Sequence, residues 1–529
     1  KAAVYASEAT GMNISVGRIS LSFPLNLVVT NVDAASPHND TLLSVRRLQV
    51  NVQLLPLLKK QVEVDGISLQ GATVNSNDLI HGMKLNGTLG ELFISSHGVA
   101  LDPETAIVNK VLLKDTDLSL CLNDTAAADT AASDTTYWKI ILQDIDLQNV
   151  SFALDMPLDS LSLAASLDNA ILRDGLIDLH KSTYSLQTFR IENGRVRYDN
   201  GKPLAADSLS SGLDPSHIAL TDIGVKLDSL YYEGRNMKAI ISQFVLKERS
   251  GVEIVSATGR MVSNDKVLRV PSLKLETRDS YLELNAAMDW NALDFKDEGL
   301  VSARLMADIG KPDVMRFMGS MDEKFIRQYP SEPLRIRTGI DGDLNKLKLT
   351  TLTAELPGAL GLFARGELTH LTDSLLRGGD ITLEAETKDL KFVSTLAEGI
   401  EIPYGTRLEG KFTMAGTKMG TDLLLMQPEA QAVVAADTIP ITVYNDSISV
   451  ADDFKMERAA RLFAKYDLSR DRYEADLAVN HFDLHQFMPA DSLYTLSTRL
   501  KVEGEGFDFF SPRTYFNAEG GIDRFHYGS

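Results

Sequence analysis

The sequence predicts a mainly β protein with a mostly antiparallel sheet and few short helices. Apolar and polar residues alternate in many short runs, such as 273–276 (LKLE) and 281–284 (YLEL). This period gives each strand one apolar and one polar face. Turn signals such as Asp199-Asn200-Gly201 separate the runs at short spacing, which favours antiparallel neighbours. Stretches with helical spacing are rare.

A loosely repeated phrase supports one continuous sheet. The pattern apolar-x-apolar-x-Asp-Ile/Thr-x-apolar occurs at 111–118, 140–147 and 218–225, with a shortened version at 64–69. We interpret each copy as the end of one strand and the start of the next. A unit with one apolar face cannot bury that face alone, so neighbouring units must extend a common sheet. The pattern therefore predicts one elongated sheet, whereas 529 residues would ordinarily suggest three or four globular domains.

The predicted elements divide the chain into four parts. Residues 1–60 form an N-terminal segment with the first strands, and 61–310 form repeated β units with a flexible, low-complexity loop at 123–136. Residues 311–330 are an inserted amphipathic helix, and 331–529 continue the β units. The helix is expected over 312–329, with Pro312 near its start. Its apolar side is Val314, Phe317, Met318, Met321 and Phe325. Shorter helical turns are expected at 389–397 and 484–488, and the Ala-rich residues 1–10 are read as the end of a helix.

Composition limits the possible partners. The chain has 53 Lys plus Arg and 73 Asp plus Glu, a net charge of -20, which argues against nucleic acid or an anionic membrane surface as the main partner. The single cysteine, Cys121, excludes an internal disulfide framework and a Cys-based zinc site. No window approaches 18 consecutive apolar residues. Because the sequence starts at Lys1 without Met and stops inside an apparent strand, we expect it to be a piece of a longer chain with an upstream anchor or signal.

Motifs for catalysis and cofactors are missing or incomplete. There is no phosphate-binding loop, no H-E-x-x-H and no G-x-S-x-G. Gly504-Glu505-Gly506 lacks the third glycine of a dinucleotide fingerprint and lies at a strand end. His481 and His485 would face one metal if both were on a helix. The β context instead favours a strand end at His481 and a helical turn at His485.

The acidic pairs have an ordinary explanation. Asp452-Asp453 and Asp341/Asp343 could bind calcium or act as acid and base, but solvated turns are the favoured interpretation. Cys121 lies between Leu120 and Leu122 and is interpreted as a small hydrophobic side chain near a strand end. The sequence therefore predicts a protein that is not an enzyme, with no cofactor and no metal.

The apolar faces have two interpretations that the residues alone leave open. They could form a dry core between two layers. They could also remain uncovered as a concave groove for acyl chains, because aromatic residues are only 7% and few helices exist to cover the strands. The candidate groove residues are same-phase pairs. They are Val62, Val64, Leu118, Leu120, Leu161, Leu163, Leu273, Leu275, Leu282, Leu284, Ile381, Leu383, Leu423, Leu425, Leu477 and Val479.

Several stretches resemble the AsmA-like and TamB (translocation and assembly module) family. Residues 11–24 (GMNISVGRISLSFP) resemble the opening of these proteins, followed by LVVTNV at 27–32, DTLLSV at 40–45 and VNVQLLPLL at 50–58. Residues 338–349 (TGIDGDLNKLKL) are similar to the family's repeating step. The stretches 402–410 and 473–504 also resemble TamB homologues. The signature C-terminal domain of TamB is not evident, so TamB and another AsmA-like relative stay open.

The resemblance implies a fold, a place and a function. It implies a curved β-groove of the β-taco type in the periplasm of a Gram-negative bacterium, held to the inner membrane by an N-terminal anchor that is missing here. It implies a non-enzymatic bridge that holds phospholipid acyl chains and carries phospholipid between the inner and outer membranes. The alternative is a scaffold that assembles outer-membrane proteins with a TamA-type barrel, for example by strand addition at sheet edges. A structural β-solenoid with a dry core is a third, weaker hypothesis.

One short motif recurs. Asp followed by Ser or Thr and an apolar residue resembles an O-glycosylation sequon that some Gram-negative bacteria use on exported proteins. Ordinary turn chemistry is the favoured interpretation. The copies start at Asp40, Asp159, Asp207, Asp228, Asp373 and Asp491.

Overall fold

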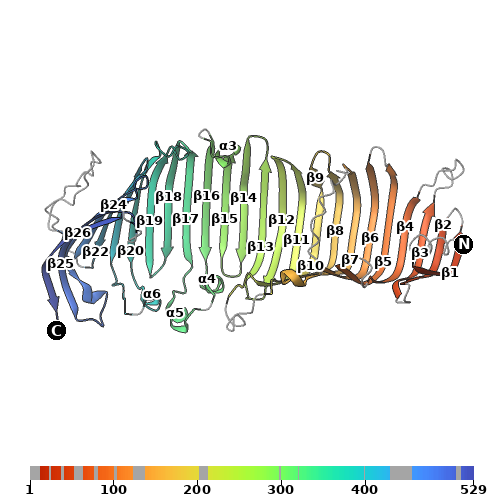
Figure 1. Cartoon of the computed structure of the whole chain (residues 1–529), viewed down its shortest axis with the longest axis horizontal. Coiled ribbons are helices and arrows are strands. Elements are labelled where there is room, and N and C mark those ends of the chain that lie inside the picture. Colours follow the sequence, from red (N-terminus) through yellow and green to blue (C-terminus); the bar gives the residue numbers. More distant parts are fainter. Residues whose placement is uncertain are drawn as a thin grey trace. The chain divides into compact units, whose positions relative to one another are not determined.

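The computed structural model confirms the predicted fold class. Strands make up 71% and helices 7%, and 26 strands form a single long, mostly antiparallel sheet (Figure 1). The residues that the structure describes are 12–22, 26–36, 41–52, 64–76, 82–100, 104–122, 137–201, 212–296, 299–319, 321–397, 399–428, 456–507, 511 and 514–528. The expected helix end at 1–10, the loop at 123–136, Val62 and the pair Asp452-Asp453 lie outside them.

The chain divides into two compact units. Unit 1 comprises Lys1–Asp265, Leu273–Arg278 and Arg316–Ser320. Unit 2 comprises Lys266–Ser272, Asp279–Met315 and Met321–Ser529. Strand β14 (Val267–Thr277) contributes residues to both units. We describe each unit by itself.

Unit 1 consists of long strands paired in chain order. The strands are β1 (Asn13–Ser22), β2 (Asn26–Ala35), β3 (Thr41–Val52), β4 (Val64–Asn75), β5 (Met83–Ala100), β6 (Thr105–Leu122), β7 (Lys139–Met156), β8 (Leu161–Asp178), β9 (Thr183–Leu186), β10 (Thr188–Asp199), β11 (His217–Glu233), β12 (Asn236–Glu248) and β13 (Glu253–Ser263). A short helix, η1 (Pro157–Asp159), follows β7. Strands β9 and β10 run one after the other, and both pair with β8 and β11.

Strands β6 and β7 pair in parallel, whereas β5–β6 and β7–β8 are antiparallel. A parallel neighbour requires a connection that returns the chain to the other end of the strand. The alternating pattern of the two strands is the same in either direction, so the sequence did not reveal this change.

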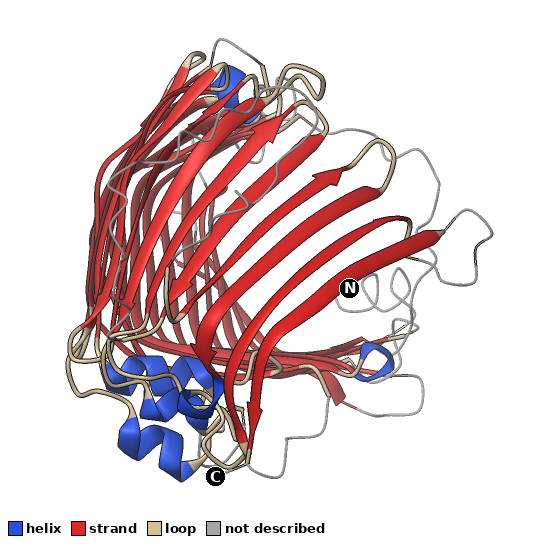
Figure 2. Cartoon of the chain, turned by 90° about the vertical axis from the view of Figure 1, so that its left-hand side faces the viewer, coloured by secondary structure: helices blue, strands red, loops and turns tan. Residues whose placement is uncertain are grey.

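The repeated phrase does not mark strand ends, and our interpretation of it was wrong. Asp115 and Asp222 lie inside β6 and β11, and both have a left-handed backbone, with φ of 49° and 52°. Asp and Asn adopt this conformation at lower cost than most residues. A residue of this kind bends a strand while pairing continues on both sides of it. Figure 2 shows strands of the sheet that are bent rather than flat.

Unit 2 has shorter strands in a regular antiparallel order. After part of β14 come β15 (Tyr281–Asp289), β16 (Leu300–Ile309), β17 (Leu334–Asp343), β18 (Lys346–Leu356), β19 (Leu360–Thr369), β20 (Gly378–Thr387), β21 (Arg407–Ala415), β22 (Lys418–Met426), β23 (Ala459–Asp467), β24 (Arg472–Asp483), β25 (Leu493–Glu505) and β26 (Tyr515–Tyr527). Each strand from β15 to β25 pairs with the next one along the chain. The unit therefore forms one ladder in sequence order.

The single helix expected at 312–329 is two helices, α4 (Lys311–Met318) and α5 (Glu323–Gln328). Gly319 ends α4 with a φ of 76°, and the Asp322 side chain caps α5 by accepting a hydrogen bond from the Lys324 N–H at 2.6 Å. The break turns Phe317 and Met318 outward, where they are 60% and 45% exposed. The other helices are α3 (Trp290–Leu293), α6 (Lys391–Ser394) and η2 (Leu484–Gln486), and the last two fall within the predicted turns.

The closed hydrophobic clusters of the described residues lie in unit 2. The larger one centres on Phe325 and Phe392, whose rings meet edge to face at 5.6 Å, and it joins α5 and α6 to the β18–β19 turn. A smaller one joins Ala292, Val301 and Leu344 under α3. Both clusters are centred on strand ends and the adjoining turns and helices rather than on the middle of the sheet. Among the described residues, no helix has the length and apolar character needed to cross a bilayer.

Candidate functional site

One face of the unit 2 sheet is lined by apolar side chains in register. Residues directly opposite each other on paired strands share a face, so the pairing defines rows across the sheet. One row crosses β15 to β26. It contains Leu284, Leu305, Thr338, Leu352, Ala364, Leu383, Gly410, Leu423, Leu462, Leu477, Leu500 and Gly520. Most of these residues are half-buried rather than enclosed.

The eight predicted groove residues of unit 2 all lie on this face. Leu284, Leu383, Leu423 and Leu477 belong to the row above. Leu282, Leu425 and Val479 belong to the next row, through pairs such as Leu282–Ala307 and Leu425–Ala460. Ile381 is two residues from Leu383 on β20 and therefore shares its face.

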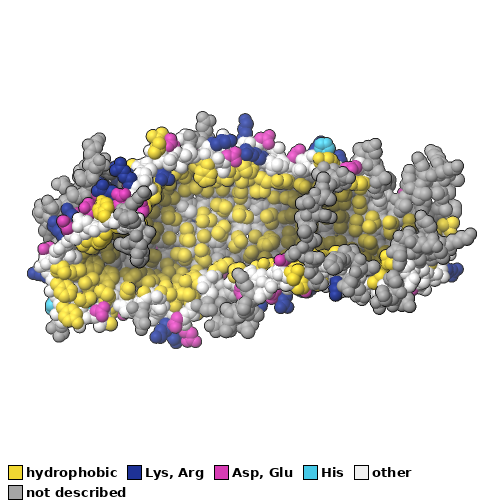
Figure 3. Space-filling model, viewed as in Figure 1, with side chains coloured by type: hydrophobic (Ala, Val, Ile, Leu, Met, Phe, Trp, Pro, Cys, Tyr) yellow, Lys and Arg dark blue, Asp and Glu magenta, His cyan; other side chains and the backbone are white. Residues whose placement is uncertain are grey.

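The opposite face carries the charges. A row there runs through Glu283, Arg337, Glu384, Glu409, Arg461 and Arg499, interrupted by a few apolar residues. Figure 3 shows the other side of unit 2, hollowed and mainly hydrophobic, with charged side chains confined to its rims. Because the charged side chains of each strand point to the opposite face, the hollowed surface is the face that carries the leucine row.

Unit 1 has the same division into an apolar and a polar face. One apolar row crosses twelve of its strands. It contains Ile19, Val29, Leu48, Leu69, Leu92, Leu113, Leu147, Ala170, Ile191, Val225, Phe244 and Ala257. The next row, from Leu21 through Val111, Ile145 and Phe189 to Ile241, is also apolar. The sequence analysis named none of these residues as candidates.

The predicted groove residues of unit 1 lie on the other side of the strand bends. Leu120 pairs with Leu154, which pairs with Leu163, and Leu118 is linked to this set through Phe152. Leu161, two residues from Leu163, faces the same way.

The last predicted pairs are placed less completely. Leu273 and Leu275 in β14 are half-buried, and the exposed Lys274 and Glu276 alternate with them, as predicted. Val64 starts β4, and its side chain is not among those described.

Among the described residues, few side chains cover the apolar face of unit 1. The buried hydrophobic residues described in unit 1 are few and mostly small, such as Val45, Ala72 and Ala170. The large side chains of the rows remain half-exposed or exposed, including Ile19 at 56% and Phe152 at 39%. Contiguous apolar surface of this kind usually marks a binding site.

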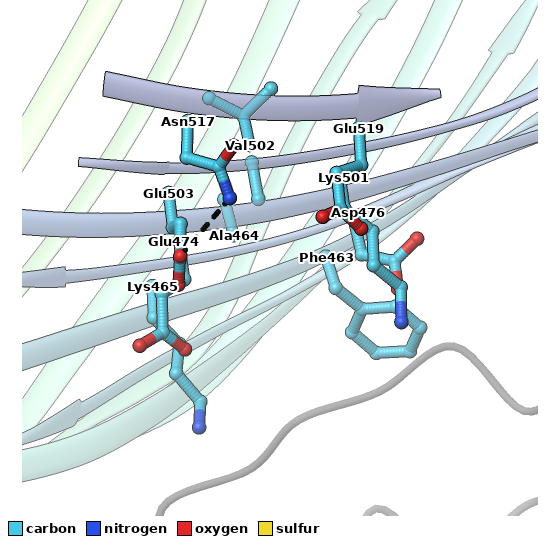
Figure 4. A pocket seen from close by; sticks show the side chains of 11 residues that line it. Phe463, Ala464, Lys465, Glu474, Asp476, Lys501, Val502, Glu503, Asn517 and Glu519 are labelled. Carbon is cyan, nitrogen blue, oxygen red and sulfur yellow. Dashed lines mark hydrogen bonds and ion pairs between the residues drawn. The ribbon is translucent and has the colours of Figure 1, made fainter. Parts of the chain in front are cut away.

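The polar face of unit 2 also has a depression, of about 360 Å³ (Figure 4). The ring of Phe463 and the alternating charges of Lys465, Glu474, Asp476 and Lys501 line it. Register places all of these side chains on the face opposite the leucines. The Lys501 ammonium lies 3.9 Å from the Asp476 carboxylate, so the charges largely compensate one another.

Shifted pKa values occur at turns and strand ends. The pKa of Asp467 lies below its ordinary value because its carboxylate accepts hydrogen bonds from the Ser469 hydroxyl and N–H, at 2.7 and 2.9 Å, and from Thr417. The pKa of Tyr466 is raised by its hydrogen bond to Asp471. These groups stabilise turns and do not form an acid–base pair around a substrate cavity.

The other sequence motifs have structural roles. His481 lies in β24 and His485 lies in η2. The His485 ring stacks on the Tyr494 ring, with 4.5 Å between the ring centres. Asp343 accepts hydrogen bonds from the N–H groups of Asn345 and Lys346, both at 2.8 Å, as expected for a turn. In the described ranges, no group of three or more His, Cys, Asp or Glu side chains could hold a metal ion.

The described copies of the Asp-Ser/Thr-apolar motif differ in setting, and Asp40 and Asp207 lie outside the described residues. Asp373 accepts hydrogen bonds from the N–H groups of Leu375 and Leu376, the turn chemistry favoured above, whereas Asp228 and Ser229 lie inside β11.

The fold and these rows define a β-sheet protein with one apolar and one polar face in each unit. No model of a known protein family matches the chain, and no curated protein is similar enough in sequence to be matched.

Proposed function

We propose that the apolar faces hold the acyl chains of phospholipids and that the protein moves lipid without catalysing a reaction. The observation that carries this proposal is the continuity of the apolar rows, such as the one from Leu284 to Gly520, on a hollowed face without charges. Each CH₂ group removed from water stabilises the bound state by about 0.8 kcal/mol. A face that is equally apolar along its length lets a chain shift position without large losses.

The wider context follows from the sequence resemblance to the AsmA-like and TamB family. In this proposal the protein works in the periplasm, is anchored in the inner membrane, and passes phospholipid between the inner and outer membranes. The charged back faces water, which suits the net charge of -20. Assembly of outer-membrane proteins with a TamA-type barrel is the alternative function.

The test uses photocrosslinking amino acids on one strand, β20. Leu383 belongs to the apolar row, whereas the adjacent Glu384 points to the polar face and is exposed. The purified chain is incubated with radiolabelled phosphatidylethanolamine vesicles and irradiated. We expect lipid adducts from position 383 and background levels from position 384. Equal labelling, or no labelling at 383, contradicts the proposal. In a parallel incubation with unfolded outer-membrane protein, adducts with that protein in place of lipid would support the alternative.

A second variant tests passage along the face. Leu383→Asp places a charge between Ala364 and Gly410, and an acyl chain would have to cross that charge in an apolar environment. We expect lipid capture to fall while the far-UV circular dichroism spectrum is unchanged. The matched control, Thr382→Asp, puts the same charge on the other face of the same strand and leaves lipid capture as in the wild type.

A further inference from the structure

A row of residues with left-handed backbone crosses unit 1. Six strands carry one such residue in this row, with φ between 49° and 63°, and β8 carries another, Asp174, outside the row. We call this set the crease row. It consists of Asn31, Gly71, Asp115, Asn149, Asn193 and Asp222. Away from turns, an isolated left-handed residue inside a strand is uncommon, so six in one sheet form a repeated feature.

The strand pairing places neighbouring members of the crease row side by side. Lys114 pairs with Gln148 and Thr116 with Val150, so Asp115 lies level with Asn149. The Asn149 side-chain amide donates a hydrogen bond to the Asp115 carboxylate at 2.9 Å. On β5, Gly90 occupies the same level, where a Cβ atom would come within 2.8 Å of the Asp115 Cβ. The bends therefore line up across the sheet.

The crease row keeps the apolar residues on one face on both sides of the bend. On β7 the apolar phase changes from Ile145 and Leu147 to Val150 and Phe152, with Asn149 at the change. The residues just inside the bend are small and buried, with Thr116 at 2% and Ala170 at 4% exposed. The bend thus has its inner side on the apolar face.

We propose that the crease row is the positioning element that makes unit 1 a two-walled trough for acyl chains. The inference rests on the proposed function and specifies how the ligand is covered. The strand segments on the two sides of the crease row form the two walls of the trough. On β6, β7 and β8 the shorter wall consists of 116–122, 150–156 and 161–167, about 23 Å of strand. Acyl chains of a membrane leaflet extend over about 15 Å. An acyl chain near the crease row is therefore covered on two sides along its length, whereas a flat sheet would cover only one side of it.

The test replaces the left-handed residues. The double variant Asp115→Val/Asn149→Val introduces β-branched side chains, which disfavour the left-handed backbone conformation. The double variant Asp115→Gly/Asn149→Gly introduces glycine, which adopts that conformation readily. Gln148→Val is the matched control, one residue from the bend on an exposed position. Spin labels at Gln143→Cys and Asp155→Cys on β7, with Cys121→Ser, measure the bend. A straight strand would place the two backbone positions about 40 Å apart.

We expect the valine pair to lengthen this distance and to lower capture of radiolabelled phosphatidylethanolamine about tenfold, the effect of exposing one or two CH₂ groups. The glycine pair and Gln148→Val should match the wild type in both measurements. If the double variant does not fold, Asn149→Val alone is used. An unchanged distance, unchanged capture by a straightened strand, or an equal loss with glycine would each overturn the inference. Failure of the wild type to capture lipid would refute the proposed function instead, because the distance measurement needs no lipid.

Discussion

At the scale of single residues, Arg461 shows how the polar face holds a charge that solvent hardly reaches. Its guanidinium makes two hydrogen bonds to the Asp422 carboxylate, at 2.9 and 2.7 Å, and lies 4.6 Å from the centre of the Phe463 ring. The two charged side chains are only 14% and 13% exposed. Two-point pairing and the aromatic face together replace the water that these groups lost.

Removing one partner should therefore be costly. Asp422→Ala leaves the guanidinium without its carboxylate, and we expect a loss of about 3 kcal/mol in the local stability of β22 and β23. Hydrogen exchange of the two strands measures this. Asp422→Leu/Arg461→Met, which removes both charges, should recover much of the loss. A double variant as unstable as Asp422→Ala would show that the packing, rather than the unpaired charge, matters.

Asp467 gives a pH dependence with a defined sign. Because the folded state lowers the pKa of this carboxyl below its ordinary 3.8, chiefly through the Ser469 hydroxyl, its contribution to stability is present above pH 3.8. The contribution is lost as pH falls through the lowered pKa. We expect the wild type to have a higher melting temperature than Asp467→Asn at pH 7 and the difference to shrink toward pH 2. A difference that stays constant from pH 7 to pH 2 would rule this out.

At the scale of elements, the helices stabilise a strand-end region and leave the sheet face open. Phe325 on α5 is 2% exposed and contacts Tyr329 and Phe392. Phe325→Ala should cost about 3–5 kcal/mol and speed hydrogen exchange in α5 and α6. Phe317→Ala on α4 is the control, because that ring is 60% exposed and its loss should change little. Similar effects of the two changes would argue against this assignment of the core.

The helices also show why element boundaries were harder to predict than element types. Helical spacing over 312–329 correctly indicated helix, and Phe325 and Val314 do join the core. Spacing alone does not show that Gly319 turns left-handed and interrupts the helix. Likewise, aspartate is common in turns, so the Asp of the repeated phrase suggested a strand end. Only the pairing with neighbouring strands on both sides of it shows that the strand continues past this residue.

At the scale of the whole molecule, each strand depends mainly on its sequence neighbours. In such a structure stability is close to a sum of local terms, so different regions unfold separately. The two tryptophans report on this, since Trp138 lies in unit 1 and Trp290 in unit 2. We expect Trp290→Phe and Trp138→Phe, each with one tryptophan left, to give urea transitions with different midpoints. Unit 1 should unfold first, because the closed clusters of the described residues lie in unit 2. Coincident transitions would show a single cooperative unit.

By itself, the sequence determined the fold class and which residues of a strand share a face, because alternation is a local property of an extended chain. This is why the two members of pairs such as Leu282/Leu284 and Leu118/Leu120 lie on the same face of their strand. Only the tertiary structure decided that these pairs join rows across a dozen strands, that β6 and β7 run in parallel, and that the crease row changes the phase within a strand. These features depend on which strand lies beside which and at what register. Such pairing joins residues far apart in the chain, and a local pattern does not encode it.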